Sequence, residues 1–106
     1  MKNTLDFSKN NGLIPVIIQE GATGEILMQG FMNEEAFAKT TETGFVYFWS
    51  RSKNRLWKKG ETSGNTLRVK KIYTDCDADA ILIKVTLNGD VCCHTGNRSC
   101  FFIELE

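Results

Sequence analysis

The fold is decided by the stretch Ile81-Leu82-Ile83-Lys84-Val85-Thr86-Leu87-Asn88-Gly89. Apolar side chains stand at every second position from Ile81 to Leu87, and the positions between them include Lys84 and Thr86. This alternation is typical of a strand that buries one face. Asn88-Gly89 is a strong signal for a hairpin turn, and it predicts that the chain returns through residues 91–93. The stretch therefore predicts antiparallel pairing around a half-buried strand.

Segments on both sides extend this prediction. Strands are expected at residues 14–19, 25–31, 45–50, 67–73 and 100–105, the last of which would close the sheet. Asn33 can cap a helix that starts with Glu34 and Glu35, and Gly44 would end it. The expected fold class is α+β, a β-rich and mostly antiparallel sheet with one main helix. Residues 1–106 are expected to form a single domain.

The composition excludes several classes of protein. The chain has 106 residues, 42% of them hydrophobic, and its 13 basic and 13 acidic side chains give a formal net charge of zero. A dedicated nucleic-acid binder would more often be clearly basic. Residues 1–11 lack the apolar segment of a signal peptide, and no apolar run approaches the roughly 18 residues of a membrane span. We therefore expect a cytoplasmic protein, whose four cysteines stay reduced and favour metal binding or catalysis over disulfides.

The cysteines in the last third of the chain are candidate metal ligands. Cys76, Cys93 and Cys100 are separated by sixteen and six residues, which is not the paired spacing of a zinc finger. Three thiolates can hold zinc and leave one position open for water, as a metal-dependent hydrolase requires. The alternative is that these cysteines are simply buried, as cysteine often is. If the segment is extended, Cys92 and Cys93 point to opposite faces, and one of them is expected to be a core residue.

His94, the only histidine, follows Cys93 in a loop rich in threonine, glycine, asparagine and serine. It can be a fourth zinc ligand, a general acid or base, or a hydrogen-bonded loop residue. Its position beside a candidate zinc thiolate favours the catalytic role.

Asp75, Asp77 and Asp79 alternate, so an extended backbone would place their carboxylates on one face. Such a group suits a hard cation, magnesium or calcium. The run is not an EF-hand, because Ala80 stands where that loop needs glycine and Thr86 where it needs glutamate. The alternative is a solvated acidic strand edge.

The segment from Ser50 to Gly64 mixes cations, hydroxyls, glycines and Trp57. Cations and exposed backbone N–H groups suit phosphate, and Trp57 offers a face on which a base can stack. The alternative is a solvated loop with Trp57 folded into the core. The segment contains neither a Walker A nor a G-x-G-x-x-G motif, which argues against an ordinary ATPase or dinucleotide enzyme. The candidate substrate-binding residues are Ser50, Arg51, Trp57, Lys58, Gly60, Glu61, Thr62 and Ser63.

Taken together, these segments resemble the phosphoribosyl-AMP cyclohydrolase family, the ring-opening enzymes of histidine biosynthesis. The resemblance covers roughly residues 11–103 and rests on five motifs in the same order. They are Gly24-Glu-Ile-Leu-Met-Gln-Gly-Phe-Met-Asn33, Tyr47-Phe-Trp-Ser-Arg-Ser52, Leu56-Trp-Lys-Lys-Gly-Glu-Thr-Ser-Gly-Asn65, Asp75-Cys-Asp-Ala-Asp79 and Cys93-His-Thr-Gly-Asn-Arg-Ser-Cys100.

The resemblance implies an intertwined homodimer with one zinc ion per subunit at the interface. Cys76 of one subunit would join Cys93 and Cys100 of the other. The three aspartates would hold magnesium, and His94 would serve catalysis. The whole chain would then be a single cyclohydrolase domain.

The reaction implied by the resemblance agrees with these residues. The substrate is an adenine that carries ribose phosphates on N1 and N9. Zinc activates water for attack on C6, the N1–C6 bond breaks, and His94 transfers a proton. A purine deaminase uses a similar attack but needs H-x-E and P-C-x-x-C motifs, which are absent here. The alternative from another class is a small zinc-stabilised nucleic-acid-binding module that uses the segment around Trp57.

Overall fold

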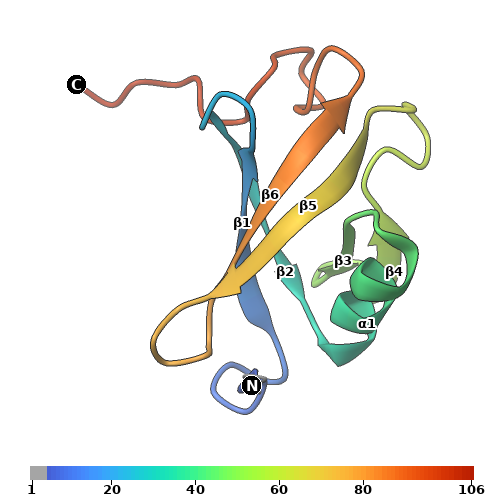
Figure 1. Cartoon of the computed structure of the whole chain (residues 1–106), viewed down its shortest axis with the longest axis vertical. Coiled ribbons are helices and arrows are strands. Elements are labelled where there is room, and N and C mark those ends of the chain that lie inside the picture. Colours follow the sequence, from blue (N-terminus) through green and yellow to red (C-terminus); the bar gives the residue numbers. More distant parts are fainter. Residues whose placement is uncertain (1–4) are drawn as a thin grey trace.

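Two small sheets and one helix make up the fold in the computed structural model, which describes residues 5–106 (Figure 1). The larger sheet has the order β2-β1-β6-β5, and the smaller one pairs β3 with β4. The strands of the larger sheet are β1 (Ile14–Glu20), β2 (Ile26–Met32), β5 (Thr66–Thr74) and β6 (Ile81–Asn88). The smaller sheet consists of β3 (Tyr47–Ser50) and β4 (Arg55–Lys58), and the helix α1 spans Glu34–Thr43.

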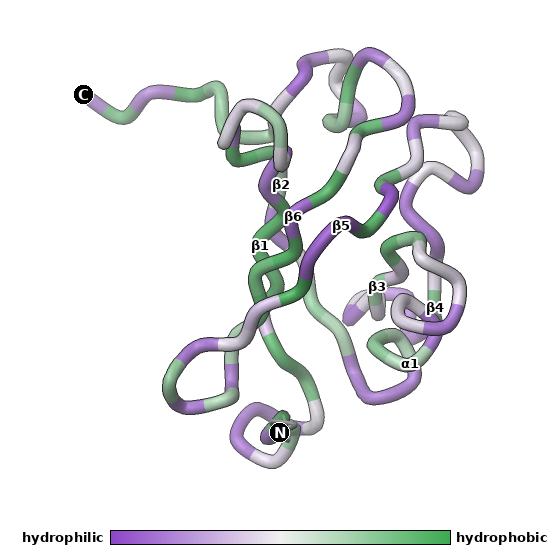
Figure 2. The backbone as a smooth tube through the Cα atoms, viewed as in Figure 1, coloured by the Kyte–Doolittle hydropathy of each residue, from purple (hydrophilic) through white to green (hydrophobic). Residues whose placement is uncertain are grey.

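The strand β6 lies at the centre of the larger sheet. It pairs in parallel with β1 and antiparallel with β5. Its buried side chains are Ile81, Ile83, Val85 and Leu87, the apolar set that the alternation predicts. They pack with residues of β1 and β2 and with Phe48 of β3 in one hydrophobic core. Figure 2 shows hydrophobic residues along much of β1 and β6.

Local signals define both ends of α1. The Asn33 side chain accepts a hydrogen bond of 2.9 Å from the backbone N–H of Ala36, and Gly44 adopts a left-handed conformation at φ 80°. The helix is ten residues long, and no helix between residues 5 and 106 has the length and apolar character needed to cross a membrane.

The α+β fold class, the mostly antiparallel sheet and the single main helix are confirmed. The strands predicted at residues 14–19, 25–31, 67–73 and 81–87 are also confirmed within a few residues. The strand predicted at residues 45–50 is shorter, and Phe45 forms only an isolated bridge to Arg68. The strand β4 was not predicted, because its sequence alternates weakly and is rich in cations.

Two predictions about the last third of the chain are wrong. Residues 91–93 do not return as a hairpin strand, because β1 and β5 already occupy both edges of β6. The backbone N–H groups of Cys92 and Cys93 instead bond Arg98 and Asn97 within the following loop. Residues 100–105 do not close the sheet, since residues 101–106 have no regular structure and are exposed.

The extended backbone predicted for Asp75, Asp77 and Asp79 is also wrong. Residues 75–80 form the loop that joins β5 to β6, and Ala78 adopts a positive φ of 60° to turn the chain. The reversal is required because β5 and β6 are antiparallel neighbours. The carboxylates therefore lie around a loop instead of along one strand face.

Candidate functional site

Three thiols gather where the chain leaves β6. Cys92 and Cys93 are buried and Cys100 is half-buried, and the three thiols lie close enough to shift one another's pKa. The loop is held to the sheet by a hydrogen bond of 2.7 Å from the Cys100 N–H to the Leu27 carbonyl of β2. Arg98 adds ion pairs to Glu20 and Glu25 at the β1–β2 turn, the latter at 2.7 Å.

The surroundings distinguish the three sulfur atoms. The Thr95 hydroxyl donates to Cys93 Sγ at 3.0 Å, and this bond, with the Thr95 N–H, lowers the pKa of the Cys93 thiol. Burial raises the pKa of Cys92, which packs into the hydrophobic core. Burial and the neighbouring Cys93 raise the pKa of Cys100 to about 11. Cys93 is thus the thiol most readily ionised, and thiolates are the form that binds metals.

Other polar residues of the loop support Cys93 indirectly. Asn97 donates its side-chain N–H to the Thr95 oxygen at 2.9 Å, which orients the hydroxyl toward the sulfur. Ser99 instead donates to the Ile26 carbonyl at 2.7 Å and anchors the loop to β2.

His94 lines a cavity of about 530 Å³, whose other walls come mainly from β3, β4 and the turn that follows β4. The cavity therefore brings the only histidine next to the segment predicted to bind substrate. Its other lining residues are Ser50, Lys53, Arg55, Trp57, Lys58, Gly60, Glu61, Thr62 and Ser63.

The turn in this cavity is held by Glu61. Its carboxylate pairs with the Arg55 guanidinium at 2.9 Å and accepts the Lys58 N–H at 3.2 Å. The Arg55 guanidinium lowers the pKa of Glu61. Lys59 links the cavity to the thiols, since its Nζ donates to the Cys92 carbonyl at 2.6 Å. The cavity therefore has a fixed wall and stands directly beside the thiol cluster.

Trp57 and Arg51 behave differently from the rest of the predicted set. Trp57 lines the cavity and also packs against Phe48, with ring centres 5.2 Å apart, so stacking of a base on its ring stays a prediction. Arg51 does not line this cavity; its guanidinium lies 4.1 Å from the centre of the Phe31 ring. Lys53 and Arg55 line the cavity although they were not singled out. The only feature of the sequence that could have identified them is their position in the cation-rich segment from Arg51 to Lys59.

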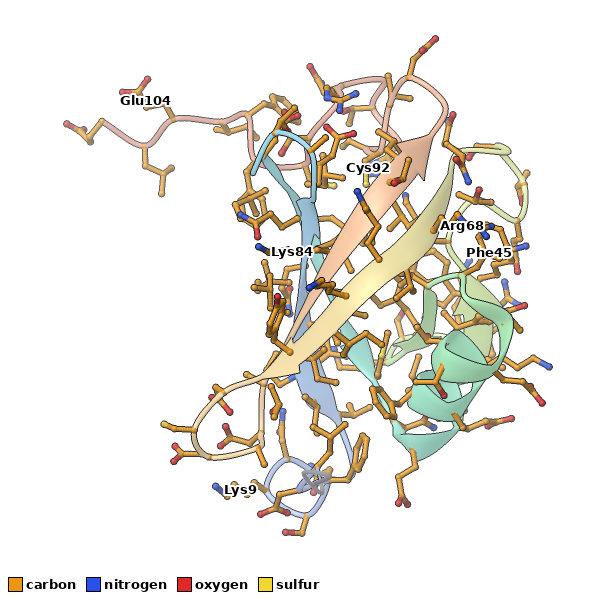
Figure 3. The ribbon with its side chains drawn as sticks, in the orientation of Figure 1. Lys9, Phe45, Arg68, Lys84, Cys92 and Glu104 are labelled. Carbon is orange, nitrogen blue, oxygen red and sulfur yellow. The ribbon has the colours of Figure 1, made fainter. Side chains whose placement is uncertain are left out.

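The aspartates and Cys76 lie far from this cavity. Figure 3 shows Cys92 at one end of the sheet and Lys9, which pairs with Asp79 at 3.3 Å, at the other. The eight residues of β6 between the two regions span roughly 26 Å. Accordingly, residues 5–106 of one chain contain no group of three His, Cys, Asp or Glu side chains able to hold a metal ion. Cys76 is exposed and contacts Asp77.

Comparison with known proteins identifies the family. The family model for phosphoribosyl-AMP cyclohydrolase matches residues 28–102. A protein of that name from Solibacter usitatus is 57% identical over 102 residues, covering 96% of this chain and 81% of the relative. Another from Listeria innocua is 58% identical over 100 residues, covering 94% of this chain and 92% of the relative. This chain belongs to the phosphoribosyl-AMP cyclohydrolase family.

Membership in the phosphoribosyl-AMP cyclohydrolase family confirms the resemblance found in the motifs. The chain is therefore an enzyme of the hydrolase class. The matched residues include the cavity, the aspartate loop and all the candidate thiols. This favours the enzyme over the nucleic-acid-binding module as the function of the segment around Trp57.

Proposed function

We propose that this protein opens the adenine ring of phosphoribosyl-AMP by hydrolysis, in the pathway of histidine biosynthesis in the cytoplasm. The observation that carries the proposal is the cavity of about 530 Å³, which joins His94 to cations and hydroxyls beside the Cys93 thiol. A phosphorylated purine needs such a combination, namely an aromatic wall, anion-binding groups and a proton-transfer group next to a site that activates water.

The cavity residues divide into two tasks. Lys53 and Lys58, with the hydroxyls of Thr62 and Ser63, bind phosphate, because cations and hydroxyl donors both stabilise phosphate oxygens. Trp57 provides the face for the adenine ring. Arg55 is partly occupied by Glu61 and shapes the turn more than it binds ligand. Arg51 reaches a ribosyl phosphate only if its stacking on Phe31 is released.

The thiols fit zinc. The Thr95 hydroxyl favours ionised Cys93, and Cys100 lies near enough for the two thiols to shift each other's pKa, so two soft ligands are already close together. A third thiolate must come from elsewhere, and we infer that Cys76 of the partner subunit supplies it in a homodimer. When bound, zinc would supply the Lewis acidity that lowers the pKa of a water toward neutrality. Each dimer would then have two equivalent sites related by its two-fold axis.

The remaining steps belong to side chains of the protein. Attack of water on C6 places an oxygen on that carbon, and the N1–C6 bond breaks as N1 takes up a proton. His94 borders the cavity and transfers this proton. Asp75, Asp77 and Asp79 of the partner subunit lie in the same loop as its Cys76. They would hold magnesium, which would neutralise the charge of the substrate phosphates.

The first experiment measures ring opening. Purified protein with zinc and magnesium should change the absorbance of phosphoribosyl-AMP, without releasing ammonia. His94→Asn should lower kcat about 100-fold to 10,000-fold with unchanged zinc content, as expected for loss of a general acid or base. Lys39→Ala on the exposed face of α1 is the matched control and should be fully active. Ammonia release from AMP would contradict the proposal in favour of a deaminase.

The second experiment tests sharing between subunits. Cys76→Ser and Cys100→Ser should each abolish turnover. Refolding the two variants together should restore about a quarter of the wild-type activity, because half of the dimers are mixed and each mixed dimer has one intact site. If the mixture stays inactive while both variants are folded and dimeric, the shared site is wrong.

A further inference from the structure

The chain ends in an apolar arm, defined here as Phe101–Glu106, that leaves the body of the molecule (Figure 1). Ile103 is 74% exposed and Leu105 is 83% exposed, and Phe101 and Phe102 are also exposed. Four large apolar side chains in such a short segment are unusual for a surface that faces only water. The arm therefore has the character of a segment that docks onto another surface.

The arm also has the sequence of a strand. Phe101, Ile103 and Leu105 alternate with Phe102, Glu104 and Glu106. This period of two residues gives one apolar face and one face with two carboxylates. Within its own chain the arm forms no strand, since the last bond to the sheet is that of Cys100 to Leu27.

The outer edge of β5 offers the complementary surface. Gly44 and Val46 bond the edge at Val69 and Leu67, but between residues 5 and 106 no strand pairs with it from Lys70 to Thr74.

The face of the sheet next to this edge carries a hollow of about 300 Å³, lined by Lys70, Lys71 and Tyr73 of β5, by Lys84 of β6 and by Gly21. The Lys84 ammonium stands 5.7 Å from the ring centre of Tyr73, which is 45% exposed. In the chain from residue 5 to 106 these lysines form no ion pair with a carboxylate. The hollow thus places an aromatic surface and three cations on the sheet face next to the unpaired edge of β5.

The zinc site proposed to be shared between subunits would bring the arm of one subunit close to the outer edge of β5 in the other. The inference therefore rests on the proposed function. If Cys100 meets Cys76 of the partner subunit, the arm begins near the partner's loop, which directly follows the end of β5 at Thr74. Six extended residues reach roughly 20 Å, whereas the edge from Thr74 back to Lys70 needs about 13 Å. The arm is therefore long enough to run antiparallel along this edge.

We propose that the arm Phe101–Glu106 adds as a strand to the outer edge of β5 in the second copy of this chain. The face of the arm with Phe102, Glu104 and Glu106 turns toward the hollow, where Phe102 packs near Tyr73 and the two carboxylates pair with the lysines. Phe101, Ile103 and Leu105 turn to the opposite face of the sheet. The two-fold axis makes the exchange reciprocal, so each subunit gives one arm and receives one. The arm then joins the dimer directly at the site that needs both subunits.

A cross-linking experiment tests the location. Photoreactive benzoylphenylalanine replaces Phe102 in the full chain, and labelled and unlabelled subunits are mixed before irradiation. Cross-links that join one labelled and one unlabelled chain should map to the segment from Lys70 to Thr74. Cross-links confined to one chain, or mapped to β2 of either chain, would overturn the proposal.

Charge reversal tests the pairing by a second route. Lys70→Glu with Lys71→Glu, or Glu104→Lys with Glu106→Lys, should raise the dissociation constant of the dimer about tenfold in sedimentation equilibrium. Combining all four changes should restore the wild-type constant. Lys39→Glu with Glu42→Lys on α1 is the matched control and should leave the constant unchanged. A combined variant as weak as its parents would overturn the pairing.

The outcomes separate this inference from the proposed function. A zinc-containing dimer with full ring-opening activity, whose cross-links miss the β5 edge, refutes only the docking of the arm. A wild-type protein that sediments as a monomer and lacks zinc refutes the shared site and the docking together.

Discussion

Cys92 and Cys93 are adjacent in the chain but lie in surroundings that shift their pKa values in opposite directions. Cys92 packs in the core, and burial raises its pKa, whereas the Thr95 hydroxyl and N–H lower the pKa of Cys93. The difference arises from one threonine two residues further on, whose hydroxyl is oriented by Asn97. Single side chains around the sulfur atoms therefore decide which of these two thiols is more readily ionised.

Thr95→Val should weaken zinc binding. The variant keeps the shape of the side chain but loses the hydroxyl that donates to Cys93 Sγ at 3.0 Å, so the pKa of this thiol should rise. Loss of such a supporting hydrogen bond typically lowers metal affinity about 10-fold to 100-fold. Competition with a chromogenic chelator measures the affinity. Thr95→Ser retains the hydroxyl and should bind zinc nearly as tightly; equal loss in both variants would contradict the explanation.

At the scale of secondary structure, Thr40 couples α1 to β3. It is the buried polar side chain of the core, and its hydroxyl donates to the Ala36 carbonyl at 2.8 Å and accepts the Tyr47 N–H at 3.0 Å. The strand β3 contributes Ser50 to the cavity, so this coupling helps to hold the cavity wall in place.

Thr40→Val should reduce the free energy of unfolding by about 1–3 kcal/mol, because the half-buried N–H of Tyr47 loses its acceptor. Urea denaturation measures the change. Thr41→Val, one residue later on the exposed side of the same helix, has the same effect on helix propensity and should change the stability by less than about 0.5 kcal/mol. Similar losses in both variants would mean that helix propensity, and not the lost acceptor, is responsible.

The turn after β4 depends on a glycine for space. Gly60 has φ +85°, and a Cβ added there would lie 2.4 Å from the Asn65 carbonyl oxygen. Gly64 has nearly the same conformation, at φ +84°, but no atom would lie within 4 Å of its added Cβ. Substitutions at Gly60 and Gly64 can therefore distinguish the effect of a steric clash from the effect of a positive φ within one turn.

Gly60→Ala should therefore displace the turn and lower kcat/KM at least about tenfold, since small shifts of positioning groups are costly in catalysis. Gly64→Ala should cost only about 1 kcal/mol of stability from its positive φ and leave kcat/KM nearly unchanged. Steady-state kinetics and urea denaturation measure both quantities. Equal kinetic effects of the two substitutions would show that the clash with Asn65 does not control the cavity.

At the scale of the whole molecule, one ion-pair cluster ties the thiol loop to the sheet. Arg98 binds Glu20 at the end of β1 and Glu25 at the start of β2. The Arg98 guanidinium lowers the pKa of Glu20 from its ordinary value of 4.5. The cluster thus connects the end of the chain to the first hairpin across most of the sequence.

Glu20 should make the stability depend on acid pH. Because its folded pKa is depressed, its contribution is present above about pH 4.5 and is lost as the pH falls through the lower folded value. Glu20→Gln should therefore melt below the wild type at pH 7, and the difference in Tm should shrink toward pH 3. Glu42→Gln, whose exposed partner Lys39 is 4.0 Å away, is the control and should show little difference at either pH. A constant difference across this range would exclude Glu20 as its source.

Much of the candidate site could be predicted from the residue types in short segments of the sequence. Seven of the eight proposed substrate-binding residues line the same cavity as His94; the exception is Arg51, which stacks on Phe31 instead. Lys53 and Arg55 were missed because nothing in a cationic loop sequence shows which cations face inward. Whether Cys76 joins the other thiols stays a prediction, since in one chain it lies in the loop before β6, whereas the other thiols follow β6.

The sequence by itself determined the helix with its caps and the four strands of the larger sheet, because these depend on contacts between residues close together in the chain. Only the tertiary structure decided which strands are neighbours. The Asn88-Gly89 signal predicted a hairpin, but β1 occupies that edge of β6 and directs the chain into the thiol loop. Period-two alternation reports which face of a strand is buried and contains no information about its edges. For the same reason, only the structure revealed that residues 101–106 have no partner strand among residues 5–106 of their own chain.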